Sequence, residues 1–259
     1  MRPVNLVNDG PLAVIELARP ETGNALEAAL VEDLGRALAE LRSTECRAAI
    51  LTGAGRHFCT GAHLGELEHL AEAPLAERLA DARRLAAVYA ELLRAPFATL
   101  AAVRGCAYGG GLGLAAACDV VVAPPDARLQ FSEVRLGFVP ALISVFLTRR
   151  VQASRLAQLF LDPTPLDGAT ALAVGLVDEV AVDPLARARE RALRIAGSAS
   201  PAAVASTKRL LLNNQFPSLD AALEDAARVN AEQRAHPECR RGVAHFLAAK
   251  AFPNWLDGD

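Results

Sequence analysis

Apolar residues in the first part of the chain occur either in short runs or at helical spacing. Leu12–Leu17 has the extended apolar pattern of a strand, and Ala48–Thr52 is a second short apolar run. Between them, apolar residues three and four positions apart predict a helix over Ala25–Leu41. A strand, a helix and a strand in this order form the unit that builds a parallel sheet.

The same alternation continues through the next part of the chain. A long helical pattern over Leu75–Leu93 stops before Pro96, and Thr99–Val103 is a further predicted strand. A glycine-rich segment then leads into an alanine-rich helix that ends near Cys118, and the next strand follows over Asp119–Ala123. The first two-thirds of the chain therefore predict an α/β fold.

After Pro140 the helical patterns predominate, and only Leu176–Val182 looks extended. The predicted helices are Ala141–Arg150, Arg155–Leu161, Asp167–Ala173, Pro184–Gly197, Pro201–Asn213 and Leu219–Arg234. A helical region of this length must bury its apolar faces against the α/β body or against a neighbouring subunit.

Composition narrows the class of protein. The chain has 259 residues, enough for one large domain or for one domain with an appendage. A formal net charge of −3 and few aromatic residues argue against a nucleic-acid partner. No uncharged run reaches the ~20 residues of a membrane helix, and the N-terminus lacks the apolar core of a signal peptide. Five cysteines without a Cys-x-x-Cys pair are expected to be reduced thiols, so we expect a soluble, cytoplasmic protein without a membrane partner.

Three consecutive glycines, Gly109, Gly110 and Gly111, stand where a predicted strand passes into a helix. Glycine lets a ligand approach the backbone closely, and free N–H groups at a helix start attract an anion or an oxyanion. The segment has neither a Gly-x-Gly-x-x-Gly register nor a Gly-Lys-Ser/Thr motif, so it predicts no nucleotide-binding loop. A tight turn that serves only helix–sheet packing explains the glycines equally well.

A second loop, Gly53–Gly65, also lies between a predicted strand and a predicted helix. Two such loops meet at the carboxyl edge of a parallel sheet, where α/β proteins bind ligands. His57, Cys59 and His63 match no common zinc spacing and lack a fourth ligand, so no metal is expected. His63 is expected to be an exposed loop side chain.

Glu133 lies among apolar residues after an extended run. A carboxylate in such surroundings is partly desolvated, which raises its pKa toward neutrality, as a general acid/base requires. The alternative is an exposed glutamate on an edge strand that pairs with Arg135. On these residues alone the alternative is the stronger of the two.

Taken together, these segments resemble the enoyl-CoA hydratase/isomerase (crotonase) superfamily, and the resemblance runs from about Leu12 to Phe246. Each sequence block alone is weak evidence for the family, but all the blocks together, in this order, are specific to it. The blocks are Arg19-Pro20 with Asn24-Ala25-Leu26, Gly61-Ala62-His63-Leu64, Gly109-Gly110-Gly111, Glu133 with Leu136-Gly137 and Pro140, and Gly175-Leu176-Val177-Asp178.

The resemblance implies a repeated β-β-α spiral core over residues 1–195 and a helical C-terminal region over residues 196–259. That region would assemble the chain into a homotrimer or a dimer of trimers. The resemblance implies no prosthetic group, and a substrate carried as a coenzyme A thioester. It assigns coenzyme contacts to Ala25, Thr60, Leu64, Phe246 and Lys250.

The same resemblance places the backbone N–H groups of Ala62 and Gly110 in an oxyanion hole and makes Glu133 the acid/base. Typical hydratases of this family have two acid/base glutamates, and the first falls here at Gly113. With one carboxylate, Glu133 either activates water and returns a proton, as in a hydratase, or only moves a proton along the acyl chain, as in a 3-enoyl to 2-enoyl-CoA isomerase. The third alternative is a non-catalytic acyl-CoA-binding subunit. The hydratase is the favoured reading.

The residues around Glu133, together with Gly113, also resemble a branch that acts on branched or glutaconyl-type thioesters, the methylglutaconyl-CoA hydratase-like branch. In that branch Arg135 is a candidate partner for a distal substrate carboxylate, although a surface salt bridge is the stronger alternative for it. The substrate pocket is expected to include Tyr108, Gly113, Arg135, Phe138 and Ala141.

Overall fold

The structure is a computed structural model, and it describes residues 2–215, 218–253 and residue 255. Its centre is a six-stranded sheet in the order β1-β2-β3-β4-β6-β8, in which only the β1–β2 pair is antiparallel. A separate parallel pair is formed by β5 and β7. The strands are β1 (Val4–Asp9), β2 (Leu12–Leu17), β3 (Ala48–Gly53), β4 (Ala98–Ala102), β5 (Cys106–Tyr108), β6 (Val120–Ala123), β7 (Arg128–Gln130) and β8 (Glu179–Val180).

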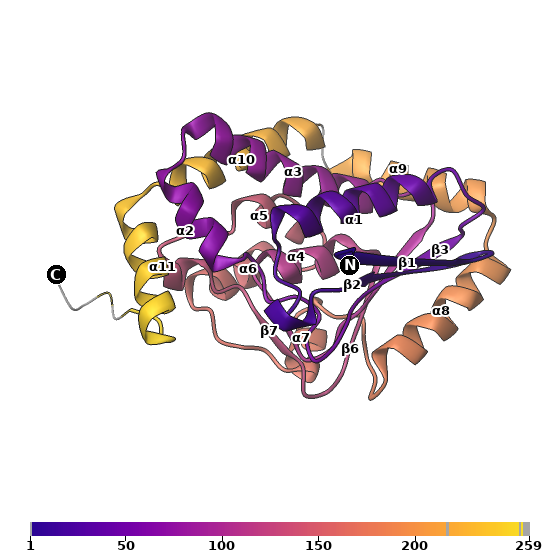
Figure 1. The fold of residues 1–259 in the computed structure, drawn as a ribbon. Helices are drawn as coiled ribbons and strands as arrows, with labels where there is room; N and C mark the ends of the chain where they lie inside the picture. Colours follow the sequence, from indigo (N-terminus) through magenta and orange to yellow (C-terminus); the bar gives the residue numbers. More distant parts are fainter. Residues whose placement is uncertain (1, 216–217, 254, 256–259) are drawn as a thin grey trace.

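Helices cover both faces of the large sheet: α8 packs on one face, and α1 and α4 pack on the other (Figure 1). The α-helices are α1 (Ala28–Leu41), α2 (Leu64–Glu72), α3 (Leu75–Leu93), α4 (Gly110–Ala117), α5 (Ala141–Leu147), α6 (Ala153–Leu161), α7 (Gly168–Ala173), α8 (Pro184–Ser198), α9 (Pro201–Gln215), α10 (Leu219–Arg234) and α11 (Pro237–Ala249). Two 3-10 helices, η1 (Pro20–Thr22) and η2 (Glu133–Leu136), lie within loops.

The predicted α/β class and most predicted elements are confirmed, with corrections at several places, among them helix α11, which was not predicted. The first helix begins at Ala28 rather than at Ala25, because Leu26 forms a β-bridge with Ala62. Strand β1 was not predicted, since four of its six positions are exposed at the sheet edge and three of these four, Asn5, Asn8 and Asp9, are polar. Strands β5 and β7 have three residues each, which is too short for a periodicity to appear.

The small parallel pair positions the loops that follow it. Cys59 bridges Ala107 in parallel, so the loop after β3 runs beside β5. Ala62 and Gly110 each lie three residues beyond this bridge and therefore leave it side by side. Strand β7, on the other side of β5, leads directly into Glu133.

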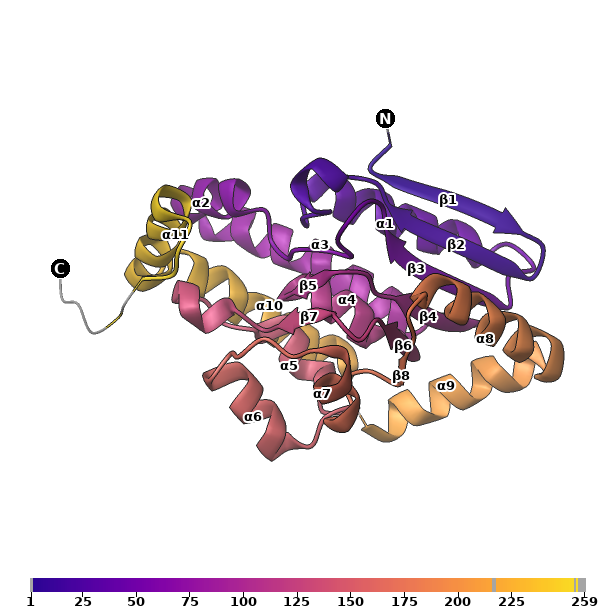
Figure 2. The same cartoon turned by 90° about the horizontal axis from the view of Figure 1, so that it is seen from below.

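The last helices fold back onto the same chain. Helix α10 packs along α3 and α5, and α11 packs against η2. Figure 2 shows α11 beside α2. The α/β body thus buries much of this region, while α9 exposes Leu210 and Leu211. The division at residue 195 and the role of residues 196–259 in assembly stay predictions. None of the helices in the described part of the chain is long and apolar enough to cross a membrane.

Candidate active site

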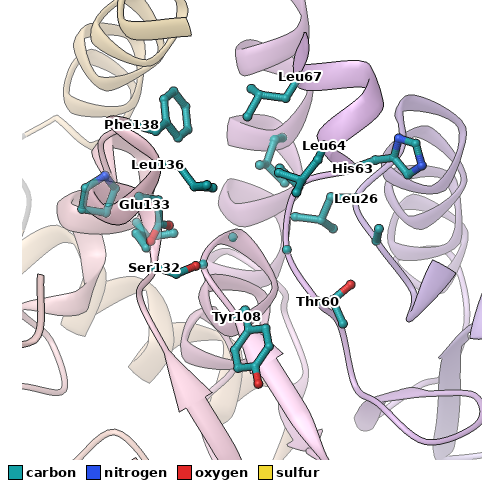
Figure 3. A pocket seen from close by; sticks show the side chains of 18 of the residues that line it. Leu26, Thr60, His63, Leu64, Leu67, Tyr108, Ser132, Glu133, Leu136 and Phe138 are labelled. Atoms are coloured by element: carbon teal, nitrogen blue, oxygen red, sulfur yellow. The ribbon is translucent and has the colours of Figure 1, made fainter. Parts of the chain in front are cut away.

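A cavity of about 670 Å³ lies between the two strand-to-helix loops, η2 and the C-terminal helices. Figure 3 shows Glu133 and Ser132 on one side of it, and Leu26 and Leu64 on the other. The cavity brings together all the predicted site residues except Gly113 and Lys250. Those that line it are Ala25, Thr60, Ala62, Leu64, Tyr108, Gly110, Glu133, Arg135, Phe138, Ala141 and Phe246.

Two backbone N–H groups in the wall of the cavity are unused. Gly110 is the first residue of α4, so its N–H has no acceptor within the helix. Neither this group nor the N–H of Ala62 donates a hydrogen bond to any residue that the structure describes. The two loops touch: a Cβ on Gly61, whose φ is +88°, would lie 2.8 Å from the carbonyl oxygen of Tyr108. Two adjacent free donors at the positive end of a helix suit an oxygen that gains negative charge.

Tyr89 holds the first residue of α4 in place. Its hydroxyl donates a 2.8 Å hydrogen bond to the carbonyl oxygen of Gly110, and its side chain is completely buried. Burial raises the pKa of Tyr89 well above its ordinary value, so the hydroxyl stays protonated and remains a donor. Sequence reasoning missed this residue, since a tyrosine on a long helix gives no sign of which distant backbone group it meets.

Glu133 is fixed by a short helical turn. Its backbone carbonyl accepts a 3.0 Å hydrogen bond from the N–H of Phe138, and Gly137, with φ +67°, ends the turn. Its Oε1 lies 3.0 Å from the position that a Cβ on Gly109 would occupy. The carboxyl group therefore rests against bare backbone, next to the free N–H of Gly110.

The surroundings of this carboxyl group determine its acidity. The Oε2 atom is buried and finds no hydrogen-bond partner among the described residues. This desolvation raises the pKa of Glu133 from its ordinary 4.5 to about 7. The alternative of an exposed glutamate paired with Arg135 is wrong, because the Arg135 guanidinium stacks over the Phe252 ring at 3.8 Å. A carboxyl group that titrates near neutrality can both accept and return a proton.

The sequence model of the enoyl-CoA hydratase/isomerase family matches residues 8–258. This chain belongs to that family. An enoyl-CoA hydratase of Alternaria alternata is 33% identical to it over 248 residues, which cover 93% of this chain and 80% of the relative. The cyclohexa-1,5-dienecarbonyl-CoA hydratase of Thauera aromatica is 36% identical over 184 residues, which cover 71% of this chain and 69% of the relative.

Solved structures agree with this assignment. The crystal structure of an enoyl-CoA hydratase/isomerase from Mycobacterium paratuberculosis superposes with a TM-score of 0.87 and 29% identity, covering 94% of this chain and 98% of the other. The predicted crotonase-type fold is thereby confirmed.

The space around Gly113, the position to which the sequence resemblance assigns a first glutamate, is closed. Gly113 does not line the cavity, contrary to the prediction. A Cβ at this position would lie 2.4 Å from Cγ2 of Ile143 and 2.9 Å from the hydroxyl oxygen of Tyr89. Side chains of α5 and α3 thus fill the space, so a carboxylate side chain does not fit at this position unless they move.

Four of the five residues that were predicted to hold the coenzyme lie in the cavity wall. Ala25, Thr60, Leu64 and Phe246 line the cavity. The N–H of Thr60 already donates to the carbonyl of Gly23 at 3.0 Å, so of its two backbone groups the carbonyl is the one left for a ligand. Lys250 ends α11 in a left-handed conformation with φ 53° and does not line the cavity, so its contact with the coenzyme stays a prediction.

His63 is not an exposed loop residue as predicted. It is half-buried at the start of α2, where its Nδ1 accepts a 3.3 Å hydrogen bond from the N–H of Glu66. The same side chain lies 4.0 Å from a carboxylate oxygen of Glu27. Within the described ranges, no three His, Cys, Asp or Glu side chains gather into a potential metal site.

The pKa of Glu133 predicts how turnover depends on pH. If the carboxylate form accepts a proton from water, the value of kcat/KM should fall about tenfold per pH unit below a pKa of about 7 and level off above it. The raised pKa places this break well above the ordinary value of a glutamate. A pH profile of kcat/KM measures it, and a break near the ordinary 4.5 would contradict the buried state of this carboxyl group.

Replacing Tyr89 by Phe removes one hydroxyl and should lower kcat about tenfold, with little change in KM. The ring still packs against Phe146, whose ring centre is 5.1 Å away, but Gly110 loses its 2.8 Å hydrogen bond. The expected loss is smaller than the roughly 10²–10³-fold loss for a direct oxyanion donor. Tyr108→Phe is the control, because the Tyr108 hydroxyl points away from Glu133 (Figure 3). Equal effects of the two changes would contradict this role.

Proposed function

We propose that this chain is an enoyl-CoA hydratase, a lyase that adds water to a 2-enoyl-CoA thioester. The observation that carries the proposal is the buried Glu133 carboxyl group, with its pKa near 7, beside the unused N–H groups of Ala62 and Gly110. A general acid/base and an anion-binding pair stand on one cavity wall. That combination suits addition to a double bond conjugated with a thioester carbonyl.

The proposed reaction has two proton transfers and one charged intermediate. The Glu133 carboxylate takes a proton from a water molecule while the water oxygen bonds to the β-carbon of the acyl group. The electron pair of the double bond moves to the thioester oxygen, where the two N–H groups stabilise the enolate, each contributing about 10²–10³ in rate. The protonated Glu133 then returns its proton to the α-carbon. The elements of water are thereby added, and Glu133 is ionised again.

The coenzyme is proposed to run along the loop after β3. Ala25, Thr60 and Leu64 line that side of the cavity, and Phe246 of α11 lies in its wall as well. No prosthetic group takes part in this scheme, and the acyl group is carried as the thioester. Assembly into trimers or hexamers is part of the proposal and is measured by light scattering of the purified protein.

A second candidate is a 3-enoyl to 2-enoyl-CoA isomerase. The observation that favours it is the closed space at Gly113, together with Glu133 as the cavity-lining carboxyl group that has a buried oxygen without a partner among the described residues. A single carboxyl group can carry one proton between two carbons without any water. The hydratase is preferred because the names of the two relatives compared above both describe hydratases.

The two reactions are separated by one pair of assays. A hydratase consumes the ultraviolet absorbance of a conjugated 2-enoyl-CoA, and in water labelled with heavy oxygen its product gains the label. An isomerase produces that absorbance from a 3-enoyl-CoA and incorporates no solvent oxygen. The protein could also bind acyl-CoA but turn over none of a set of short, branched and carboxylated substrates. That result would overturn both the hydratase and the isomerase function and indicate a non-catalytic subunit.

A further inference from the structure

The cavity extends from the oxyanion donors along α3. Asp81, Leu85 and Tyr89 occur four residues apart, so one face of this helix lines the cavity. Tyr89 contacts Gly110 directly, and Cδ2 of Leu85 lies 3.7 Å from the Cβ position of Gly110. Asp81 is one turn further, about 6 Å along the helix axis. A short acyl chain bound at Gly110 therefore reaches the neighbourhood of Asp81.

A buried arginine meets Asp81 at this end of the cavity. The side chain of Arg234, on α10, is 8% exposed and forms an ion pair with Oδ2 of Asp81 through Nη1. Its Nε donates a 3.1 Å hydrogen bond to Oδ1 of Asn230, which is also buried and lines the cavity. The Nη2 of Arg234 and the Nδ2 of Asn230 donate to no group in the part of the chain that the structure describes.

The acceptors at this end are already occupied. The other oxygen of Asp81 accepts a 2.8 Å hydrogen bond from Nη2 of Arg84, so the aspartate lies between two guanidinium groups. A second carboxylate, Glu32, lies 3.9 Å from Arg84 at the surface, so the two cations and two carboxylates of the cluster balance in formal charge. The groups left free on the cavity-lining residues of this cluster are thus N–H donors.

We infer that this cluster is an acyl subsite that binds the carboxylate of a substrate whose acyl chain ends in one. The inference rests on the proposed hydratase function and names its substrate class. A planar carboxylate accepts hydrogen bonds from Nη2 of Arg234 and Nδ2 of Asn230, and the charge of the guanidinium strengthens the first of them. An ion pair that only holds α10 on α3 would not require two further free donors on residues that line the cavity.

The inference also replaces an earlier assignment. Arg135 was the sequence-based candidate for meeting a distal carboxylate, but its guanidinium stacks over Phe252 at 3.8 Å. Arg135 belongs to the turn that holds Glu133, and Phe252 follows α11. The free donors of Asn230 and Arg234 lie instead on α10, next to the α3 face that leads away from Gly110.

The test compares two substrates of equal chain length, glutaconyl-CoA, which ends in a carboxylate, and 2-pentenoyl-CoA, which ends in a methyl group. The measured quantity is the ratio of kcat/KM for the first to that for the second. The double variant Asp81→Leu/Arg234→Met removes both charges of the buried ion pair and leaves the partly exposed Arg84 with Glu32 at 3.9 Å. We expect the wild-type ratio to exceed one and to fall at least about tenfold in this variant, since hydrogen bonds to charged groups carry energies of this size.

Arg234→Lys keeps the charge next to Asp81 but removes the forked donor, so it should lower the same ratio severalfold. If thermal melting shows that the double variant does not fold, Arg234→Lys alone tests whether the subsite exists. The matched control is Arg135→Met, which should leave the ratio unchanged. A wild-type ratio below one, or a ratio unchanged in Arg234→Lys and in a folded double variant, would overturn the subsite. Failure to hydrate either substrate would instead overturn the hydratase proposal itself.

Discussion

Replacement of Glu133 by Gln is expected to lower kcat by about 10³-fold, with acyl-CoA binding retained. The amide fills the same space against Gly109 but cannot accept a proton from water or return one to carbon, and general acid/base catalysis contributes about 10²–10⁴ in rate. Hydration kinetics measure the loss, and calorimetric titration with an unreactive saturated acyl-CoA measures binding. A suitable control is Glu66→Gln in the same cavity wall, because a Gln oxygen can still accept the 3.0 Å hydrogen bond from the N–H of Ala28.

The same change should make the folded protein more stable at pH 8. Because the pKa of Glu133 is about 7 when folded and near the ordinary 4.5 when unfolded, its stabilising contribution is complete below pH 4.5 and is lost as the pH rises through 7. Above that range the buried charge costs about 3 kcal/mol, which a neutral Gln avoids. Denaturant unfolding of both proteins at low and high pH measures the difference. A Gln variant that is inactive but also destabilised at pH 8 would indicate a structural role.

Replacement of Gly113 by Glu is expected to destabilise the protein by about 3 kcal/mol or more, and not to supply a second acid/base. The new Cβ would meet Ile143 at 2.4 Å and the Tyr89 hydroxyl at 2.9 Å, and the new carboxylate would be buried without a partner. For a chain of this size the melting temperature should fall by roughly 10 °C. Thermal unfolding followed by circular dichroism measures the change.

The cause of this loss is tested by making room for the new side chain. Ile143→Ala shortens the side chain that comes closest, so Gly113→Glu should cost less in the Ile143→Ala background than in the wild-type protein. Ile143→Ala alone supplies the reference, with a cavity cost of about 2–5 kcal/mol. A Gly113→Glu variant that melts at the wild-type temperature would show that the site is not closed.

Several parts of the fold could be predicted because their signals are local. Strand β2 and helix α3 were predicted at their observed bounds, since apolar spacing decides such elements. Strands β5 and β7 could not be, because three residues do not establish a period. Helix α11 was also missed, although the start of its pattern at Pro237 is typical of a first helical residue.

The residues of the candidate site could likewise be predicted only in part. The glycines at 109–111 and the residues around Glu133 could be singled out, because glycine runs at a helix start and a carboxylate among apolar residues are features of neighbouring positions. Arg234 was overlooked, because its position beside Asp81 depends on where a C-terminal helix packs, which no local pattern records.

The sequence by itself determined the α/β class, the two loops that contain Ala62 and Gly110, and the position of Glu133 among apolar neighbours. Only the tertiary structure decided that these groups share one cavity, that burial raises the pKa of Glu133 to about 7, and that Arg234 lies beside the acyl path. Residue types and spacings are properties of the chain. Desolvation and contact between distant residues arise only when separate elements pack together.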